Sequence, residues 1–233
     1  MVPFYERFLG RFPDEWVLAS ASVGQVLASW SGLGYNRRAL ALRDAARTVA
    51  ERGWPREAAG LRALPGVGPY TAAAVASFAF GEQVAAVDVN VRRVVERVDG
   101  GRLSPAHASA RAAELLAPGR AADCNQALME LGATLCTARA PRCGRCPIRE
   151  GCASAFAGGA ADRIARDAAA APPSRSEPRF EDTNRYVRGR VVRALVKGEE
   201  LPADMEVDRL ERALSGLERD GLIVRTSACV GLA

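Results

Sequence analysis

The chain has 233 residues, of which 48% are hydrophobic and 25% are charged, as in a globular protein with one large domain and room for a small second one. A membrane span needs about 20 apolar residues, and no apolar run in the chain approaches that length. The first residues also lack the features of a secretory signal. We therefore expect a cytoplasmic protein with no membrane partner. A net charge of +5 is compatible with nucleic acid binding but does not establish it.

Two residue types are scarce enough to exclude mechanisms. Lys197 is the only lysine and His107 the only histidine. A lysine Schiff base therefore cannot form in the first 196 residues. A histidine-based acid or triad would depend on His107, which we interpret as a surface residue on a loop or at a helix start.

Apolar residues recur at helical spacing through about residue 157. The predicted helices are centred on Phe4–Leu9 and cover about residues 23–30, 37–52, 57–63, 70–80, 89–98, 105–116 and 121–135. Valine is abundant in 89–98 and favours strands, but Val91, Val94, Val95 and Val98 share one helical face, and Asp88 can cap the helix. Arg92, Arg93 and Glu96 fall on another face. The main domain, residues 1–157, is expected to be all-α.

The composition changes after this region. Residues 158–183 contain alanine, proline and serine runs and are predicted to form a linker. Residues 184–233 are predicted to be a small α/β appendage, with helices at about 185–197 and 207–219 and a short strand from Leu222. This order is similar to a truncated winged-helix unit, and a simple packing appendage is equally compatible with it.

A turn rich in glycine and proline, Leu64-Pro-Gly-Val-Gly-Pro-Tyr70, lies between two predicted short helices. Gly66 and Gly68 permit positive φ and leave the backbone N–H groups open to a phosphate. Pro69 suits the first turn of the next helix, whose positive end would face the same anion. We therefore predict DNA backbone contacts at Leu64, Gly66, Val67 and Gly68.

Four cysteines, Cys136, Cys143, Cys146 and Cys152, have the spacing C-x6-C-x2-C-x5-C. Thiolates at such spacing in a cytoplasmic protein are more often metal ligands than disulfides. Zinc and an iron–sulfur cluster are both compatible with four thiolates. Cys124 and Cys229 fall outside the spacing and are interpreted as ordinary thiols.

Together, these segments resemble a known family. The turn, the segment Val87-Asp-Val-Asn-Val-Arg-Arg-Val94, the segment Asn125-Gln-Ala-Leu-Met-Glu-Leu-Gly132 and the cysteine loop are similar to the helix–hairpin–helix DNA glycosylases with a [4Fe–4S] cluster. Trp30-Ser-Gly-Leu-Gly-Tyr35 resembles the adenine glycosylases of the MutY type more than the endonuclease III branch. The resemblance covers about residues 2–157.

The resemblance assigns roles to the residues at matching positions. Asp88 corresponds to the catalytic aspartate, which would stabilise positive charge on the sugar as the base leaves. Tyr70 stands where endonuclease III-like enzymes carry a nucleophilic lysine, which implies a monofunctional glycosylase. The four cysteines would bind the [4Fe–4S] cluster. Arg142 and Arg145, within a loop that also holds Arg139 and Arg149, would contact DNA phosphates.

The implied activity is hydrolysis of the N-glycosidic bond of adenine mispaired with guanine or 8-oxoguanine. The implied partner is mismatched double-stranded DNA, bound by a monomer associated with the nucleoid. Two alternatives remain open. Tyrosine at position 70 also occurs in glycosylases that remove thymine from G·T mismatches. The other alternative is a DNA-binding protein that carries the cluster but has weak or no catalytic activity.

The chain departs from the family at both ends. The stretch resembling Val2–Phe8 is preceded in the family by helices that carry an acid for protonating adenine and a segment that enters the duplex. From this we expect a truncated amino end, exposed apolar surface and low activity for residues 1–233, with excision restored by upstream extension. The appendage is too short for the β-rich domain that recognises 8-oxoguanine.

Overall fold

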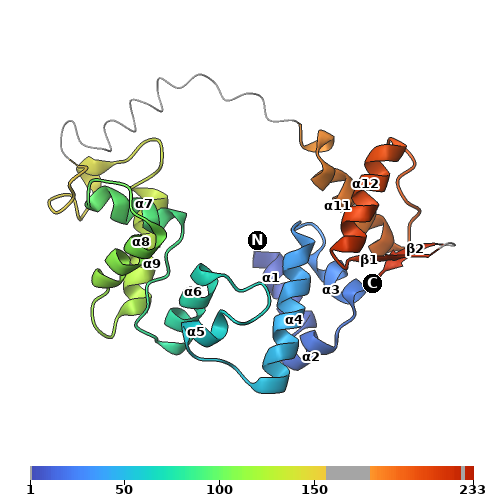
Figure 1. The fold of residues 1–233 in the computed structure, drawn as a ribbon, viewed down its shortest axis with the longest axis horizontal. Helices are drawn as coiled ribbons and strands as arrows, with labels where there is room; N and C mark the ends of the chain where they lie inside the picture. Colours follow the sequence, from blue (N-terminus) through green and yellow to red (C-terminus); the bar gives the residue numbers. More distant parts are fainter. Residues whose placement is uncertain (1, 156–178, 227–228) are drawn as a thin grey trace. The chain divides into compact units, whose positions relative to one another are not determined.

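The computed structural model describes residues 2–155, 179–226 and 229–233, and this part of the chain is mainly helical (Figure 1). The α-helices are α1 (Val2–Arg11), α2 (Glu15–Ser20), α3 (Val23–Trp30), α4 (Asn36–Arg52), α5 (Ala58–Leu61), α6 (Pro69–Phe80), α7 (Val89–Val98), α8 (Pro105–Glu114), α9 (Ala121–Thr134), α11 (Asn184–Lys197) and α12 (Val207–Arg219). Two short 3-10 turns, η1 (Cys143–Arg145) and η2 (Phe180–Asp182), and an antiparallel pair of strands, β1 (Ile223–Arg225) and β2 (Val230–Leu232), complete the described elements. None of the described helices is long and apolar enough to cross a membrane.

Most of the predicted helices are confirmed, including the valine-rich α7, which begins at an Asp88 cap as expected. His107 is exposed in the first turn of α8, where its N–H donates to Ser104 Oγ at 3.2 Å. Helix α2 and strand β2 were not predicted. The signal for α2 was present in the sequence, because Asp14 caps it by accepting a hydrogen bond from the N–H of Val17 at 2.8 Å.

The described chain divides into two compact units. The first unit contains the residues up to Trp54 together with those from Arg179 onward, and the second begins at Pro55. The hairpin turn, Asp88 and the four cysteines all belong to the second unit, which we call the hairpin unit. The first is called the two-ended unit, because it combines both ends of the described chain.

The two-ended unit has a core shared by its early and late segments. Val23 and Leu27 of α3 pack with Val191 of α11, Leu217 of α12 and Ile223 of β1. A second cluster joins Phe12, Leu18, Val26, Ala39 and Ala46, and so holds α2, α3 and α4 together. The apolar stripes of α11 and α12 are therefore buried against α3 as well as against each other.

These units differ from the domain limits that the sequence predicts. Residues from Asn184 onward were expected to form a separate appendage, whereas their core residues also include Val23 and Leu27 of α3. The physical reason is that an amphipathic stripe indicates burial but not its partner. Of the predicted linker, 158–183, only the last five residues lie within the described part of the chain, and Phe180–Asp182 form η2 there.

The hairpin unit is built around α7. Val91 and Val95 of α7 are fully buried against Ala108 and Ala112 of α8, and Leu128 of α9 packs on the same cluster. Helices α5 and α6 pair with each other, and α6 also contacts α9. Helices α8 and α9 both pack on α7, and Asp88 is the N-cap at which α7 begins.

Candidate active site and cluster loop

Asp88 lies at the start of α7 and its carboxylate is held by three hydrogen bonds. Oδ1 accepts from the N–H groups of Asn90 at 2.8 Å and Val91 at 2.7 Å, and Oδ2 accepts from Asn90 Nδ2 at 2.9 Å. The side chain is only partly buried. All three partners are donors, and they stand at the positive end of the helix, so the surroundings stabilise the anion. The N-cap role predicted for Asp88 is thus confirmed, and the residue remains partly exposed.

Asn90 and Arg93 connect this carboxylate to the cysteine loop. Asn90 Oδ1 accepts a hydrogen bond from Arg93 Nη2 at 2.8 Å. The same guanidinium donates from Nη2 to the carbonyl of Gly132 at 2.6 Å and from Nε to the carbonyl of Cys136 at 2.8 Å. A continuous chain of hydrogen bonds therefore runs from Asp88 to the backbone of the first cysteine. The sequence placed Arg93 on a face away from the core, and its inward partners were missed.

Gly132 permits the close approach of α9 to α7. A Cβ atom at this position would lie 2.7 Å from the Cβ and 2.9 Å from the carbonyl oxygen of Asn90. Real Cβ atoms do not tolerate such distances, so any side chain here would displace the first turn of α7. Gly132 belongs to the segment that carried the family resemblance, and the contact gives a physical reason for glycine at that place.

Asn125 fixes the extended segment that leads into Asp88. Its side chain is fully buried, and its Oδ1 accepts from the N–H of Ala86 at 3.0 Å. Its Nδ2 donates to Ser77 Oγ and to the carbonyl of Val84, both at 2.9 Å. One amide therefore joins α6, α9 and the approach to Asp88. This role was also missed, although Asn125 opens the Asn125–Gly132 segment that the sequence singled out.

The hairpin turn has the geometry of a type II β-turn. Pro65 and Gly66 occupy its central positions, Gly66 has φ of 72°, and the N–H of Val67 donates to the carbonyl of Leu64 at 3.1 Å. Gly68 differs from the expectation of positive φ: it has φ of −85° and is the N-cap of α6. No side chain caps this end of α6, so its first N–H groups are open to an anion.

Leu64, a predicted DNA contact, and Tyr70, a predicted active-site residue, have different surroundings. The side chain of Leu64 is buried, so only its backbone can reach a ligand, while Gly66 is exposed. Tyr70 is 41% exposed on α6, and its hydroxyl is 3.8 Å from the sulfur of Met129. That contact directs the Tyr70 hydroxyl to α9 and not to the Asp88 carboxylate.

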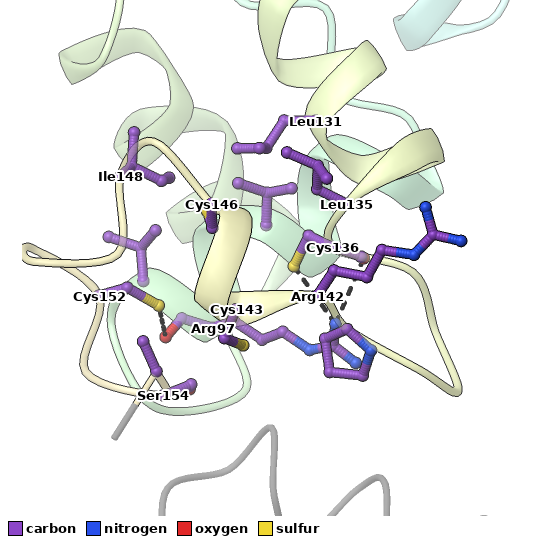
Figure 2. Close-up of a pocket in the computed structure, with 14 residues that line it drawn as sticks. Arg97, Leu131, Leu135, Cys136, Arg142, Cys143, Cys146, Ile148, Cys152 and Ser154 are labelled. Carbon is purple, nitrogen blue, oxygen red and sulfur yellow. Dashed lines mark hydrogen bonds between the residues drawn. The ribbon is translucent and has the colours of Figure 1, made fainter. Parts of the chain in front are cut away.

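The four cysteines Cys136, Cys143, Cys146 and Cys152 line one cavity, shown in Figure 2. All four are partly buried and none forms a disulfide. Within the described residues, no three cysteine, histidine or acidic side chains lie close enough to share a single metal ion. Four thiols around a common cavity are the ligand set that either a [4Fe–4S] cluster or a tetrahedral zinc ion requires.

Burial and mutual proximity govern the protonation of these thiols. Burial raises the pKa of Cys143, and the negative charge of neighbouring cysteines raises it further. Burial likewise raises the pKa of Cys152, although backbone hydrogen bonds from Ser154 and Ala155 oppose the effect. A bound metal favours the thiolate form of such thiols, because its positive charge offsets the cost of burying negative sulfur atoms.

Arg97 is a buried residue that lines the cavity and binds the cysteine loop. It is only 4% exposed, and Nη1 donates to the carbonyl of Thr137 at 2.8 Å and to Cys136 Sγ at 3.2 Å, while Nη2 donates to the carbonyl of Ala138 at 3.0 Å. Its Nε and the hydroxyl of Ser154 are buried without a partner in the described residues, and both residues line the cavity. These donors around four sulfur atoms suit an anionic, sulfur-rich group.

The arginines of the loop face outward. Arg139, Arg142, Arg145 and Arg149 are exposed, and in Figure 2 the Arg142 side chain points away from the cavity. None of the four takes part in an ion pair with a residue that the structure describes. The loop therefore combines an inward sulfur set with an outward basic surface.

Comparison with known proteins shows the class of protein to which this chain belongs. The HhH-GPD superfamily of base excision DNA repair proteins matches residues 1–118, and the iron–sulfur binding domain of endonuclease III matches residues 136–152. The chain belongs to the HhH-GPD superfamily. It is accordingly a base excision repair enzyme of the DNA glycosylase class, with DNA as its partner and a [4Fe–4S] cluster as its cofactor.

Three curated relatives of this chain are named adenine DNA glycosylases. An adenine DNA glycosylase from Mycobacterium tuberculosis is 41% identical over 97% of this chain and 77% of the relative. One from Mycolicibacterium smegmatis is 38% identical over 97% of this chain and 78% of the relative. The human adenine DNA glycosylase is 41% identical over 65% of this chain, but this match covers only 30% of the human protein.

Solved structures support the same fold. A trapped endonuclease III–DNA covalent intermediate matches with a TM-score of 0.58 at 24% identity, covering 66% of this chain and 75% of that one. A thermostable thymine-DNA glycosylase matches with a TM-score of 0.59 at 32% identity, covering 64% and 73%. The helix–hairpin–helix fold with a small two-stranded sheet near its carboxyl end is therefore confirmed.

Proposed function

We propose that this chain hydrolyses the N-glycosidic bond of adenine in DNA, acting on adenine opposite guanine or 8-oxoguanine. The mycobacterial relatives, which match nearly the whole chain, are named adenine DNA glycosylases. The observation that carries the proposal is the Asp88 carboxylate, fixed by three donors at the start of α7 and only partly buried.

The chemistry requires a fixed negative charge beside the sugar. A base within the stack is inaccessible, so the target nucleotide must be rotated out of the duplex. Departure of the base leaves positive charge on the sugar ring, which a nearby carboxylate stabilises until water adds to the same carbon. Asp88 suits this role because its oxygens are already oriented by Asn90 and Val91, and so need not reorganise as charge develops.

The hairpin supplies a means of holding the DNA backbone without reading its sequence. The open N–H groups at the start of α6, which follow the turn at Gly66, would bind a phosphate, assisted by the positive end of that helix. Leu64, Val67 and Gly68 would contribute through their backbone atoms. Arg142 and Arg145, exposed on the cysteine loop, would add a second set of phosphate contacts.

Tyr70 supports a monofunctional enzyme. A phenol cannot form a Schiff base with the sugar, and the first 196 residues contain no lysine that could do so. Borohydride treatment during the reaction should therefore trap no covalent protein–DNA complex. A trapped complex would contradict the assignment of water as the nucleophile while leaving base excision itself intact.

Cys136, Cys143, Cys146 and Cys152 are proposed as the ligands of the cluster. When bound, the cluster supplies a rigid link between α9 and the segment that ends at Cys152. Arg97 would hold the loop carbonyls and one sulfur atom, and Arg93 would connect the loop to Asn90 and Asp88. Through these contacts a bound cluster would help to fix the position of the Asp88 carboxylate.

Asp88→Asn tests the central assignment. The Oδ1 atom of asparagine can still accept the two backbone capping hydrogen bonds, so the helix should persist while the negative charge and the hydrogen bond from Asn90 Nδ2 are lost. We expect single-turnover excision of adenine from an A·8-oxoguanine duplex to fall by about a hundredfold or more, with duplex affinity largely unchanged. Asp14→Asn is a matched control, because Asp14 caps α2 in the same way in the two-ended unit. Equal, measurable excision by the Asp88→Asn protein and the unchanged chain would refute the role of Asp88.

A second candidate is the removal of thymine from G·T mismatches. The 32% identity to a thymine-DNA glycosylase of known structure favours it, and Tyr70 permits it. Duplexes that carry A·8-oxoguanine, A·G or T·G, treated with alkali after incubation, would separate the two activities. Tight duplex binding with cleavage of none of the three would instead indicate a cluster-bearing DNA-binding protein.

A further inference from the structure

The two-ended unit contains a groove that the proposed catalytic machinery does not use. Its volume is about 510 Å³, and it lies between the α3–α4 loop with the start of α4 on one side and α11 on the other. Five of its fifteen lining residues are arginines, and none of the fifteen is acidic. The arginines are Arg37, Arg38, Arg185, Arg188 and Arg193. A groove that concentrates this much positive charge selects for an anionic ligand.

Part of this charge is neutralised and part is not. Asp220 forms ion pairs with Arg188 and, at 3.7 Å, with Arg37, whose side chain remains 75% exposed. Arg38, Arg185 and Arg193 are exposed and form no ion pair with any residue in the described ranges. Three guanidinium groups therefore face the groove with their charge available to a ligand.

Arg185 is held in position by aromatic rings. Its guanidinium lies 4.7 Å from the ring centre of Tyr35 and 5.5 Å from that of Phe180, and its Nη1 is 3.4 Å from the Tyr35 hydroxyl. Stacking leaves the edge of the guanidinium plane free to donate hydrogen bonds. The side chain is thus ordered before any ligand binds, which lowers the entropic cost of using it in recognition.

The opposite wall of the groove is also well defined. Gly32, Gly34 and Tyr35 have φ of 95°, 68° and 51°, so the loop turns sharply before α4. The indole N–H of Trp30 donates to the carbonyl of Gly34 at 2.8 Å and fixes the turn. The groove is therefore a preformed feature of the unit and not a gap between freely moving side chains.

We propose that this groove binds the sugar–phosphate backbone of double-stranded DNA, as a further DNA-contacting site besides those proposed for the hairpin and the cysteine loop. Helix α11 is then a DNA-binding element as well as a packing element. The proposal rests on the proposed function only for the identity of the polyanion, because it requires DNA binding and not base excision.

The composition of the lining favours a backbone over a small molecule. Small-molecule pockets are lined mainly by apolar side chains with a few polar groups, whereas this groove presents guanidinium groups on two separate elements. Arginine donates in pairs to phosphate oxygens, and spaced arginines match the repeating charge of a nucleic acid strand. Sequence reading is not expected, because backbone contacts fix position without identifying bases.

The test compares two double variants with the same change in charge. Arg185→Ala/Arg193→Ala removes two unpaired groove arginines, and Arg212→Ala/Arg219→Ala removes two exposed arginines of α12 that do not line the groove. Duplex affinity is measured by fluorescence anisotropy from low to moderate salt. The groove variant should bind more weakly and reduce the slope of log affinity against log salt by about 2. The control variant should retain the original slope.

Further measurements separate the outcomes. Arg185→Lys/Arg193→Lys keeps the charge and should restore most of the salt slope. Equal slopes for the groove variant, the control and the unchanged chain would overturn the proposal. Weakened binding of a mononucleotide by the groove variant, with duplex affinity unchanged, would also overturn it in favour of a small ligand. Excision assays on the same proteins report on the proposed function separately, since weakened binding without any excision would leave the groove assignment intact.

Discussion

One set of arginines in the hairpin unit and one set in the two-ended unit stand in different environments. In the hairpin unit, Arg93 and Arg97 turn inward and donate to backbone carbonyls of α9 and the cysteine loop. In the two-ended unit, Arg38, Arg185 and Arg193 line an open groove with their charge exposed. An arginine bound to carbonyls orders a loop, whereas an unpaired one attracts a ligand.

The two sets of arginines are therefore expected to have different roles: the inward set positions the loop, and the groove set binds a ligand. Changes to the inward arginines should alter stability, cluster retention and the rate of excision. Changes to the groove arginines should alter affinity and its salt dependence, with little effect on the fold. The experiments below test that division, beginning with the change expected to be most damaging.

Arg97→Met should have the largest effect. The substitution keeps an apolar stem but removes donors from the carbonyls of Thr137 and Ala138 and from Cys136 Sγ. Buried acceptors left without donors cost about 1–3 kcal/mol each, so the loop should open. We expect less iron per chain and faster loss of the visible cluster absorbance in the presence of a chelator.

Arg139→Met is the matched control for this change. Arg139 lies in the same loop but is exposed. Its replacement should leave iron content unchanged and lower only duplex affinity. Equal cluster retention in the two variants would show that the inward hydrogen bonds of Arg97 do not stabilise the loop, and the comparison between the units would lose its basis.

Gly132→Ala is expected to be the next most damaging. Alanine normally stabilises a helix interior relative to glycine by about 1 kcal/mol. Here its Cβ would lie 2.7 Å from the Cβ of Asn90, so overpacking should reverse the sign and cost about 1–3 kcal/mol. Displacement of Asn90 should also move Asp88 and lower excision. Thermal unfolding and single-turnover kinetics measure the two consequences.

Gly10→Ala provides the reference for a helical glycine with free space. No atom lies within 4 Å of a Cβ built at Gly10 in α1. Its melting temperature should be unchanged or higher. If Gly132→Ala behaves in the same way and retains full excision, then the close approach of α9 to α7 does not position the carboxylate.

Periodicity and capping residues were sufficient to predict most helices. The spacing of Val91, Val94, Val95 and Val98 outweighed the strand preference of valine, because Asp88 supplies the cap that starts a helix there. The same reasoning could have found α2 from Asp14. Local signals of this kind depend only on residues that are close together in the sequence, so a single sequence is enough to interpret them.

Partners distant in sequence could not be predicted in this way. Arg93 was placed on an outer face of its helix, but its acceptors, Gly132 and Cys136, come from another element. Asn125 is likewise connected to Ser77 and Ala86 across the fold. The packing of α11 on α3 was missed for the same reason, since an apolar stripe does not identify what covers it.

The smallest effect is expected from Glu211→Gln, which tests an exposed arginine that does have an acidic partner. Arg225 of β1 donates to both carboxylate oxygens of Glu211 on α12, at 2.6 Å and 3.1 Å. The hydrogen bond to Arg225 lowers the pKa of Glu211 below its ordinary value of 4.5. Because the pKa is lowered in the folded state, the pair contributes stability above that ordinary value, and the contribution is lost as pH falls through the folded-state pKa.

Unfolding of both proteins by urea at a series of pH values checks this prediction. The unchanged chain should be slightly more stable than the Glu211→Gln variant at neutral pH, and the two should converge in acid. The difference should also shrink in high salt, since both side chains are partly exposed and the pair is screened. A difference that persists unchanged in acid would mean that Glu211 acts through packing and not through its charge. The division of arginines into those that order the backbone and those that act through exposed charge would then not account for Arg225.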